Sequence, residues 1–408
     1  MIKRTIEKVI RKSLRTFPVT VIVGARQVGK STLVDSIGKE LGYTYVSLDD
    51  LTLRAEASGD PKFFLSRFKA PLIIDEAQKA PLLFDEIARI VNEARRSGGN
   101  ANGMYILTGS ESTDLKDKIK ESLAGRANPL DMYSLSYDES IGRAEEPLSY
   151  DPSRYFPIVS TDSVGDAFKR IVKGGYPELF VNDELQAQSF YSAYLKTYIE
   201  RDVKKLIKDA NEMKFIQFMQ YCASLTGQEL EKTKISRAIG IEMKTLDAWL
   251  SILVKTNIIR LLQPYIDSSL TKRIVRAQKL YFQDTGLAAY LARLGDPQNL
   301  SLSYFAGAFF ETYCVNEIIK GFSNNDRKAE FYFYRDNHQN EIDLVILEDG
   351  VLHPIEIKQT MNPGASDVKA FSQLNDSAYS VGTGYLICLI DRLYKIKDGV
   401  FAIPISSI

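Results

Sequence analysis

The chain has 408 residues, of which 45% are hydrophobic and 25% charged, and its 52 lysines and arginines balance 52 aspartates and glutamates. This composition excludes a disordered or fibrous protein. A net charge of zero also argues against a protein that holds nucleic acid by bulk charge, although a local basic stripe could still do so. Because an ordinary domain has roughly 100–200 residues, the length predicts two or three domains.

The cysteines and the hydropathy bear on the cellular compartment. Three cysteines, at positions 222, 314 and 388, lie far apart without paired spacing, so we expect buried thiols in a reducing cytoplasm. A zinc site is not expected, since neither of the two histidines lies near a cysteine pair. No apolar run approaches the ~18 residues that span a bilayer, and no signal-peptide pattern follows the basic start. We therefore predict a cytoplasmic protein without a membrane partner.

The first predicted element is an amphipathic helix over residues 3–15, which Pro18 ends before the first strand. Its outer face is basic. That face could contact a nucleic-acid backbone or an acidic partner, but a solvated helix face is the commoner outcome.

A nucleotide site is predicted after the second element. The β-branched run of residues 19–23 has strand composition and leads into Gly24-x-x-x-x-Gly29-Lys30-Ser31, the spacing of a phosphate-binding loop. Glycines let backbone amides converge on a phosphate, Lys30 would reach the β- and γ-phosphates, and Ser31 would ligate Mg²⁺. The alternative is a chance match in a strand-turn-helix unit. The predicted nucleotide-binding residues are Gly24, Ala25, Arg26, Gln27, Val28, Gly29, Lys30, Ser31, Thr32 and Thr108.

A partner motif follows at residues 71–76, an apolar run that ends in Asp75 and Glu76. We expect this strand to lie beside the first strand in a parallel sheet. Its carboxyl end would then deliver Asp75 to the magnesium ion and Glu76 to the water that attacks the γ-phosphate. Two acids at a solvated strand end are the alternative.

Two further stretches are candidates for nucleotide sensing. A strand over residues 104–107 ends in Thr108-Gly109-Ser110, where a polar side chain can sense the γ-phosphate, although a polar turn is also ordinary loop chemistry. Downstream, Arg126 could stabilise charge on the transferring phosphoryl group, in this chain's site or in a neighbour's. The second case requires a homo-oligomer.

These motifs, taken together, resemble one branch of a known superfamily. Five blocks occur in the same order, at residues 24–31, 48–50, 74–81, 107–110 and 123–126. They resemble the prokaryotic AAA+ ATPases that carry a C-terminal domain of unknown function. The resemblance implies an AAA+ core with Lys30 and Ser31 as Walker A residues, Asp75 and Glu76 as Walker B residues, and a sensor at Thr108 or Ser110. ATP and Mg²⁺ are the implied cofactors.

The middle of the chain predicts a connector and a helical module. Residues 145–165 are rich in proline and serine, which suits a linker. The helical stretch of residues 185–208 contains the charged cluster 198–202, which also resembles this ATPase family and could report on nucleotide or tie domains together. An exposed ion-pair ladder is the alternative.

Residues 215–282 have the outline of a winged helix. Helices are predicted over 215–225, 232–239 and 243–256, followed by a hairpin from strands near 258–262 and 273–282. The third helix is not basic, and its Trp249 is expected in the core, so base reading is not indicated. The wing is the better DNA-facing candidate, and a protein-interaction role remains the alternative. The basic wing residues are Lys272, Arg273, Arg276 and Lys279.

The C-terminal part carries a second chemical constellation. Strands are predicted over 330–334, 341–346 and 353–358, with Asp343 and Glu356 placed to hold Mg²⁺ and Lys358 to steady the attacking water or the phosphorane. The order resembles PD-(D/E)XK nucleases of the restriction-endonuclease-like fold, with Glu311 as their N-terminal helix acid, although the proline before Asp343 is absent. The alternatives are a chance arrangement of charges or an inactive binding platform.

We therefore predict an α/β protein with four parts: an AAA+ P-loop core (1–135), a helical connector (136–205), a winged-helix module (206–280) and a small nuclease-like α/β domain (281–408). In one hypothesis ATP turnover drives DNA cleavage by the distal site. In a second, the protein is an ATP-gated switch that binds DNA or a protein partner with an inactive nuclease-like fold. A phosphotransferase is a weaker third, because Glu76 directly after Asp75 suits water activation.

Overall fold

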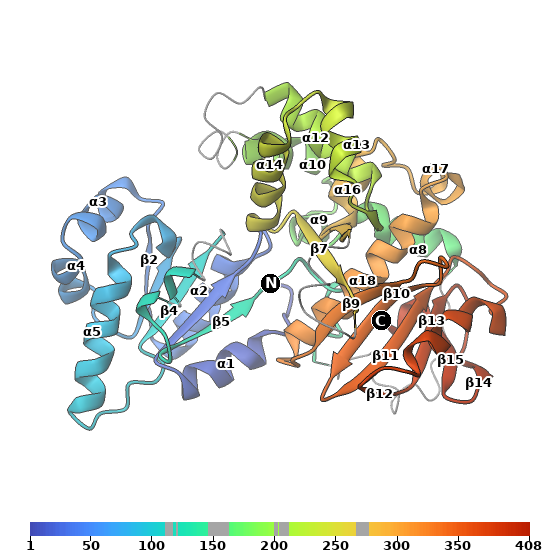
Figure 1. Cartoon of the computed structure of the whole chain (residues 1–408). Helices are drawn as coiled ribbons and strands as arrows, with labels where there is room; N and C mark the ends of the chain where they lie inside the picture. The colour runs from blue at the N-terminus through green and yellow to red at the C-terminus, as the bar shows by residue number, and fades with distance from the viewer. Residues whose placement is uncertain (111–116, 120, 146–162, 200–202, 204–211, 267–276) are drawn as a thin grey trace. The chain divides into compact units, whose positions relative to one another are not determined.

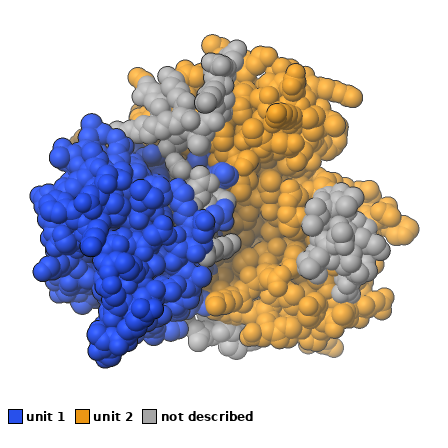
Figure 2. Space-filling view, turned by 60° about the vertical axis from the view of Figure 1, so that its left-hand side comes forward, with its two compact units in different colours: residues 1–145, 255–257, 323–326 blue, residues 146–254, 258–322, 327–408 orange. Residues whose placement is uncertain are grey.

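The computed structural model describes residues 1–110, 117–119, 121–145, 163–199, 203, 212–266 and 277–408. It divides into two compact units, drawn in blue and orange in Figure 2. Unit 1 comprises residues 1–145, 255–257 and 323–326, and unit 2 comprises 146–254, 258–322 and 327–408. Each unit is described by itself.

The described part of unit 1 contains a five-stranded parallel sheet in the order β2-β3-β4-β1-β5. Strands β2, β4 and β5 of this sheet are labelled in Figure 1. The expectation that the strand of Asp75 lies directly beside the first strand is wrong, because β4 lies between β3 and β1. All five residues of β4 are buried, which explains its place inside the sheet, where Tyr105 pairs with Val19 on one side and Leu72 on the other. The strands are β1 (Val19–Val23), β2 (Thr44–Ser47), β3 (Leu72–Asp75), β4 (Tyr105–Gly109) and β5 (Ala127–Asp131).

Helices of unit 1 bury apolar stripes against this sheet. The predicted first helix is present as α1, with Val9, Ile10 and Leu14 buried. In α5, acids occupy the first turn and arginines the last, which complements the helix dipole, while Phe84 and Ile87 join the sheet residues in one core. The helices are α1 (Glu7–Thr16), α2 (Lys30–Leu41), α3 (Leu51–Gly59), α4 (Pro61–Arg67), η1 (Ala77–Lys79), α5 (Leu83–Arg96) and α7 (Tyr137–Ser140).

The predicted helical trio of the middle segment is present in unit 2 as α12, α13 and α14. Trp249 of α14 is buried as predicted, with its ring centroid 5.1 Å from that of Phe215 and 5.5 Å from that of Phe218. Aromatic packing therefore joins α14 to α12. The helices that lie wholly or mostly in unit 2 are α8 (Val164–Lys173), α9 (Glu178–Val181), α10 (Ala187–Tyr198), α12 (Glu212–Ser224), α13 (Lys232–Ile239), α14 (Met243–Lys255), α16 (Thr285–Leu291), α17 (Pro297–Leu302), α18 (Ala306–Asn324), η4 (Ala365–Leu374) and η5 (Ile405–Ser407).

Within the described residues of unit 2, one ten-stranded mixed sheet runs in the order β14-β15-β13-β11-β10-β9-β7-β8-β6, with β12 paired beside β11 (Figure 1). Strand β7 pairs antiparallel with β8 over Ile259 to Leu262 and parallel with β9 at Gln263 and Pro264. The strands are β6 (Gln228–Glu229), β7 (Ile259–Pro264), β8 (Lys279–Phe282), β9 (Glu330–Arg335), β10 (Glu341–Glu348), β11 (Val351–Ile357), β12 (Ser380–Val381), β13 (Gly384–Cys388), β14 (Tyr394–Lys397) and β15 (Val400–Pro404).

Several predictions fall outside the described residues: most of the 145–165 linker, the charged residues 200–202, and the wing residues Lys272, Arg273 and Arg276. The three cysteines are buried and free of disulfides, which confirms the expected buried thiols. Across the described ranges, none of the helices combines the length and apolar character needed to cross a bilayer.

Candidate nucleotide-binding site and distal carboxylate cluster

The loop between β1 and α2 has the backbone geometry of a phosphate cradle. Gln27 and Gly29 have φ values of 61° and 95°, and Gly29 leads directly into the first turn of α2. A Cβ atom on Gly24 would lie 2.0 Å from the carbonyl oxygen of Met132, so a side chain there cannot fit without backbone movement. The amino end of α2 then points unpaired amides at the loop, where an anion is stabilised.

Lys30 and Ser31 lie where the sequence predicts them. The Lys30 ammonium is buried and donates hydrogen bonds to the carbonyl oxygens of Gly24 (2.8 Å) and Ala25 (2.7 Å). The Ser31 hydroxyl donates to both carboxylate oxygens of Asp75, at 2.9 and 3.0 Å. The structure thus brings the two halves of the predicted site together from α2 and β3.

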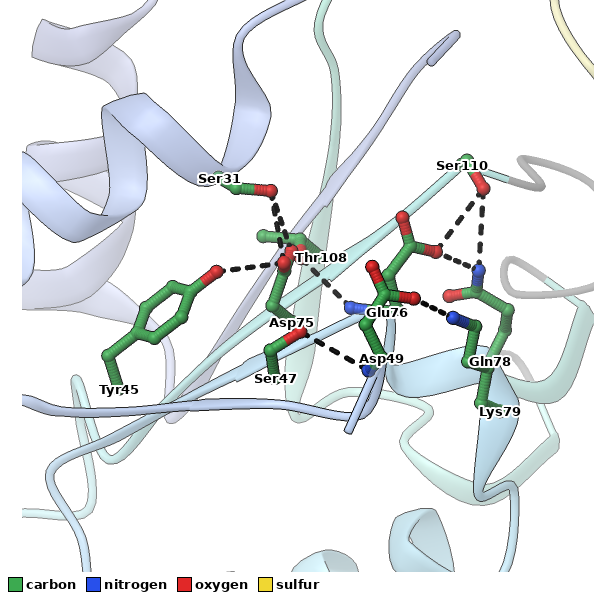
Figure 3. A network of polar contacts seen from close by, with 10 residues as sticks. All are labelled: Ser31, Tyr45, Ser47, Asp49, Asp75, Glu76, Gln78, Lys79, Thr108 and Ser110. Atoms are coloured by element: carbon green, nitrogen blue, oxygen red, sulfur yellow. Dashed lines mark hydrogen bonds and ion pairs between the residues drawn. The ribbon is translucent and has the colours of Figure 1, made fainter. Parts of the chain in front are cut away.

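Asp75 is held by hydroxyl groups from three elements (Figure 3). Besides Ser31, it accepts hydrogen bonds from Thr108 at the end of β4 and from the Tyr45 hydroxyl of β2, the latter at 2.8 Å. Burial and the bond to Asp75 raise the pKa of Tyr45 well above its usual value, so Tyr45 remains a protonated donor. Tyr45, the second residue of β2, is not among the residues that the sequence predicts for this site.

Glu76 has a left-handed backbone, with φ 56°, which is unusual for a residue other than glycine and is typical of functional positions. Its carboxylate accepts hydrogen bonds from the Gln78 amide and, at 3.3 Å, from the Ser110 hydroxyl (Figure 3). Its backbone N–H donates to the Thr108 hydroxyl at 3.3 Å. Glu76 is therefore oriented by two side chains, of which Gln78 was not predicted.

Two further acids, Asp49 and Asp50, follow β2 and make local contacts near the site. Asp49 forms an ion pair with Lys79, while its backbone N–H donates to the Ser47 hydroxyl at 3.2 Å (Figure 3). Asp50 instead caps α3, accepting from the amides of Thr52 and Leu53. The segment after β2 is thus held by an ion pair and local hydrogen bonds.

Arg4 supports the loop from outside and was also missed. Its guanidinium donates to the carbonyl oxygens of Val28 (2.8 Å) and Tyr133 (2.7 Å) and lies 3.1 Å from the Glu139 carboxylate. Both charged side chains are almost completely buried. No sequence signal distinguishes Arg4 from the other basic residues of its segment.

Arg126 is the predicted residue that the structure places away from its own site. It immediately precedes β5, whose Ala127 pairs with Val19 at the amino end of β1, whereas the phosphate loop follows the carboxyl end. A five-residue strand makes that separation about 16 Å. Its guanidinium donates instead to Asn92 (2.8 Å) and to the carbonyl oxygen of Ala124 (3.0 Å). Arg126 thus lies away from this chain's own phosphate loop, and its role in phosphoryl transfer stays a prediction.

The donor chemistry at Ser31 and Asp75 fits a magnesium ion, because hydroxyl and carboxylate oxygens are the hard ligands that Mg²⁺ prefers. The two oxygen groups lie together in a largely buried position. Magnesium bound there would take its other ligands from phosphates and water, as is usual at such sites. Among the described residues, no group of three or more His, Cys, Asp or Glu side chains forms a metal cage.

The distal acids also come together, in unit 2. Pairing of Leu344 with Ile355 places Asp343 opposite Glu356 at the next position of β10 and β11, and the Ile357 amide donates to Asp343 at 2.9 Å. Burial, reinforced by Asp343, raises the pKa of Glu311 to about 7 and that of Glu356 to about 9. Lys358 lies 3.5 Å from Glu356 and 3.3 Å from Asp367.

Lys279 corrects the prediction of a DNA-facing wing residue. It is 2% exposed, and its ammonium lies 2.9 Å from Glu311, 2.5 Å from Glu341 and 3.6 Å from Asp343. The reason is its place on β8, whose residues all point into packed surroundings. A lysine so enclosed cannot contact DNA.

Comparison with family models gives one match within unit 1. A family model described as "AAA domain" matches residues 16–141. The match supports an AAA-type P-loop ATPase domain over these residues. Two further models, each described as a domain of unknown function, match residues 165–298 (DUF8612) and residues 306–408 (DUF4143).

Similar whole chains include two uncharacterized proteins, from Mycobacterium bovis and Mycobacterium tuberculosis. Each is 25% identical over 358 residues, which is 88% of this chain and 74% of the relative. Among solved structures, the Walker-type ATPase of Pyrococcus abyssi is 16% identical, covers 71% of this chain and 96% of that chain, and has a TM-score of 0.46. RuvB of Thermotoga maritima is 14% identical, covers 62% and 88%, and has a TM-score of 0.30.

Proposed function

We propose that the protein hydrolyses ATP with Mg²⁺ in unit 1 and uses the nucleotide state to control unit 2. The observation that supports hydrolysis is the shared network at the carboxyl ends of β3 and β4. There Ser31, Asp75 and Thr108 are joined by hydrogen bonds, and Glu76 is aimed by Gln78 and Ser110 (Figure 3). A phosphate-binding loop alone would fit many kinases, but a carboxylate oriented beside the metal-binding aspartate suits activation of water.

Each residue has a role in this reaction. Lys30 exchanges its bonds to the Gly24 and Ala25 carbonyls for bonds to phosphate oxygens, which keeps its buried charge compensated. Ser31 and Asp75 would hold Mg²⁺, which would supply positive charge to neutralise the phosphates. Glu76 orients the attacking water, and Thr108 links the two acids because its hydroxyl contacts both Asp75 and the Glu76 amide.

The test is the substitution Glu76→Gln in the full chain, measured as steady-state ATP turnover and as binding of a labelled ATP analogue. We expect turnover to fall by about 100-fold or more with nucleotide binding retained, the range for loss of a positioned acid-base group. Glu93→Gln is the matched control, because Glu93 pairs with Arg89 on an exposed face of α5. Undiminished turnover in Glu76→Gln would refute hydrolysis at this site.

For unit 2 we propose a winged helix joined to a nuclease-like domain that associates with DNA. The order α12, β6, α13, α14, β7, β8 supports the first assignment, because β6 and β7 both pair with β8 beside the helical trio. The helix α18 followed by β9, β10 and β11, with Asp343 opposite Glu356, supports the second. The expected setting is cytoplasmic, with Arg126 acting across a homo-oligomer.

The proposed control of unit 2 by the nucleotide state of unit 1 can take two forms. In one, Asp343, Glu356 and Lys358 cleave DNA under ATP control. In the other, the fold is an ATP-gated switch that binds DNA or a protein partner without cleavage. The buried Lys279 beside Asp343 favours the switch, because it puts an ammonium group among the acids that cleavage would need for a metal.

A paired assay separates the two forms: ATP turnover with and without DNA, and DNA integrity with Mg²⁺ or Mn²⁺, in the wild type and Asp343→Ala. For the switch we expect turnover to respond to DNA or to a partner while DNA stays intact in both proteins. Cleavage that disappears in Asp343→Ala would establish the nuclease form instead.

A further inference from the structure

We propose that Lys279 is a permanent internal cation of the distal carboxylate cluster and takes the place that a divalent metal ion would occupy there. The cluster consists of Glu311, Glu341, Asp343 and Glu356. The inference rests on the proposed function in one respect: the nuclease-like assignment is the reason to consider a divalent metal ion here. It gives a physical basis for the form of that proposal in which the protein is a switch without DNA cleavage.

The contacts of the Lys279 ammonium are those of a central cation. It lies 2.9 Å from a Glu311 oxygen on α18 and 2.5 Å and 3.6 Å from oxygens of Glu341 and Asp343 on β10. The Tyr281 hydroxyl, from the same strand as Lys279, donates to Glu311 at 2.5 Å. One positive charge therefore collects carboxylates from two separate elements, as a bound metal ion does.

The backbone that carries Lys279 lies inside the sheet, and its side chain is enclosed. Strand β8 is hydrogen-bonded on both edges, to β6 and to β7, and all four of its residues are buried. The ammonium also lies 5.5 Å from the centre of the Phe333 ring, which closes another side. The Lys279 side chain thus extends from a paired strand into buried surroundings, which keeps its ammonium group beside the acids.

Glu356 shows that the cluster retains a position for a metal ligand. Its side chain is 10% exposed, and its Oε2 atom is buried with no hydrogen-bond partner among the described residues. Asp343 and Glu356 stand one position beyond the paired residues Leu344 and Ile355. One Asp343 oxygen lies 3.6 Å from the Lys279 ammonium, and the other accepts a hydrogen bond from the Ile357 amide. A divalent cation could use these oxygens, but the adjacent fixed ammonium repels it.

The inference is tested by counting bound Mn²⁺ by electron paramagnetic resonance on the full, nucleotide-free chain. The wild type and Asp343→Asn should bind the same number of ions, because the cluster already holds its cation. Lys279→Met should bind one ion more, and the double variant Lys279→Met with Asp343→Asn should lose it. Lys395→Met is the matched control, since it removes one exposed ammonium of unit 2 paired with Asp398 and should leave the count unchanged.

Three results would overturn the inference: a wild-type Mn²⁺ site that Asp343→Asn or Glu356→Gln removes, a folded Lys279→Met protein that gains no ion, or a gain that Lys395→Met reproduces. Circular dichroism reports whether Lys279→Met folds, and if it does not, the wild-type comparison with Asp343→Asn decides alone. These counts involve neither ATP turnover nor DNA, so failure of the proposed function leaves them readable.

Discussion

At the scale of single residues, Arg4 connects three other segments of unit 1 beside the nucleotide site. It binds the carbonyl oxygen of Val28 inside the phosphate loop, the carbonyl oxygen of Tyr133 after β5, and the buried carboxylate of Glu139. Glu139 in turn accepts from the amides of Thr5 and Ser136. The loop is therefore braced by charge, and its shape depends on residues that never contact a phosphate.

We predict that Arg4→Ala lowers the free energy of unfolding of unit 1 by about 3–5 kcal/mol, because it leaves Glu139 as a buried unpaired charge. Weaker binding of ATP should accompany this loss. Urea denaturation and titration with a labelled nucleotide measure the two effects. Lys3→Ala is the control: Lys3 pairs with Glu145 in solvent, so its removal should cost less than about 1 kcal/mol. Equal effects from both substitutions would contradict the brace.

The residues that sequence reasoning found and missed differ in a physical way. Lys30, Ser31, Asp75 and Glu76 are identified by spacing, because a phosphate loop and a strand end impose fixed intervals along the chain. Tyr45 contacts Asp75, 30 residues along the chain, and Arg4 contacts Tyr133, 129 residues along, and no sequence motif fixes either separation. Gln78 lies two residues from Glu76, but no motif of the chain assigns a role to that position. The basic residues near Lys279 predict a DNA-facing wing, whereas its burial follows from the pairing of β8 in the folded sheet.

At the scale of elements, helices were predicted more closely than strand neighbours. The amphipathic patterns of α1, α13 and α14 fix their limits to within a few residues, because one apolar stripe must face one core. The position of β4 between β3 and β1 was not predicted, since strand order depends on long-range pairing that the local pattern does not specify. The parallel direction was predictable because helices separate the strands.

The packing of α12 against α14 gives a test at this scale. Trp249→Ala removes the side chain that contacts Phe215 and Phe218, and loss of such a buried aromatic costs about 3–5 kcal/mol. We expect the midpoint of urea unfolding of unit 2, followed by circular dichroism, to fall accordingly. Met213→Ala, at an exposed position of α12, should change the free energy of unfolding by less than about 0.5 kcal/mol. If the two variants unfold alike, Trp249 is not a core residue of this module.

At the scale of the whole molecule, the nucleotide site lies in unit 1 and all three cysteines lie in unit 2. Burial raises the pKa of Cys388 to about 12 and that of Cys222 and Cys314 well above the usual value. Because the reactive species is the thiolate, native thiols should stay unlabelled between pH 7 and pH 9. Thiol exposure therefore reports the unfolding of unit 2, separately from ligand binding in unit 1.

This arrangement tests the coupling itself. We predict that a non-hydrolysable ATP analogue with Mg²⁺ raises the urea concentration at which the thiols become reactive, because a ligand of one unit stabilises the other only when the two are energetically linked. Lys30→Ala, which cannot retain the nucleotide, should abolish the shift, and Lys39→Ala, an exposed lysine of the same helix paired with Asp35, should keep it. An unshifted thiol midpoint in protein that demonstrably binds the analogue would mean that the units act independently.

Strand β7 has a mechanical consequence for unit 2. Its first residues pair with β8 and its last with β9, so the backbone bonds of two segments more than 40 residues apart meet on one strand. Neither part of the sheet can therefore be removed without exposing an unpaired strand. Truncating the chain near residue 300 would remove the β9 partners of Gln263 and Pro264, and the unpaired edge of β7 would be prone to aggregation. The two parts of the sheet therefore share β7 and cannot separate without breaking its backbone hydrogen bonds.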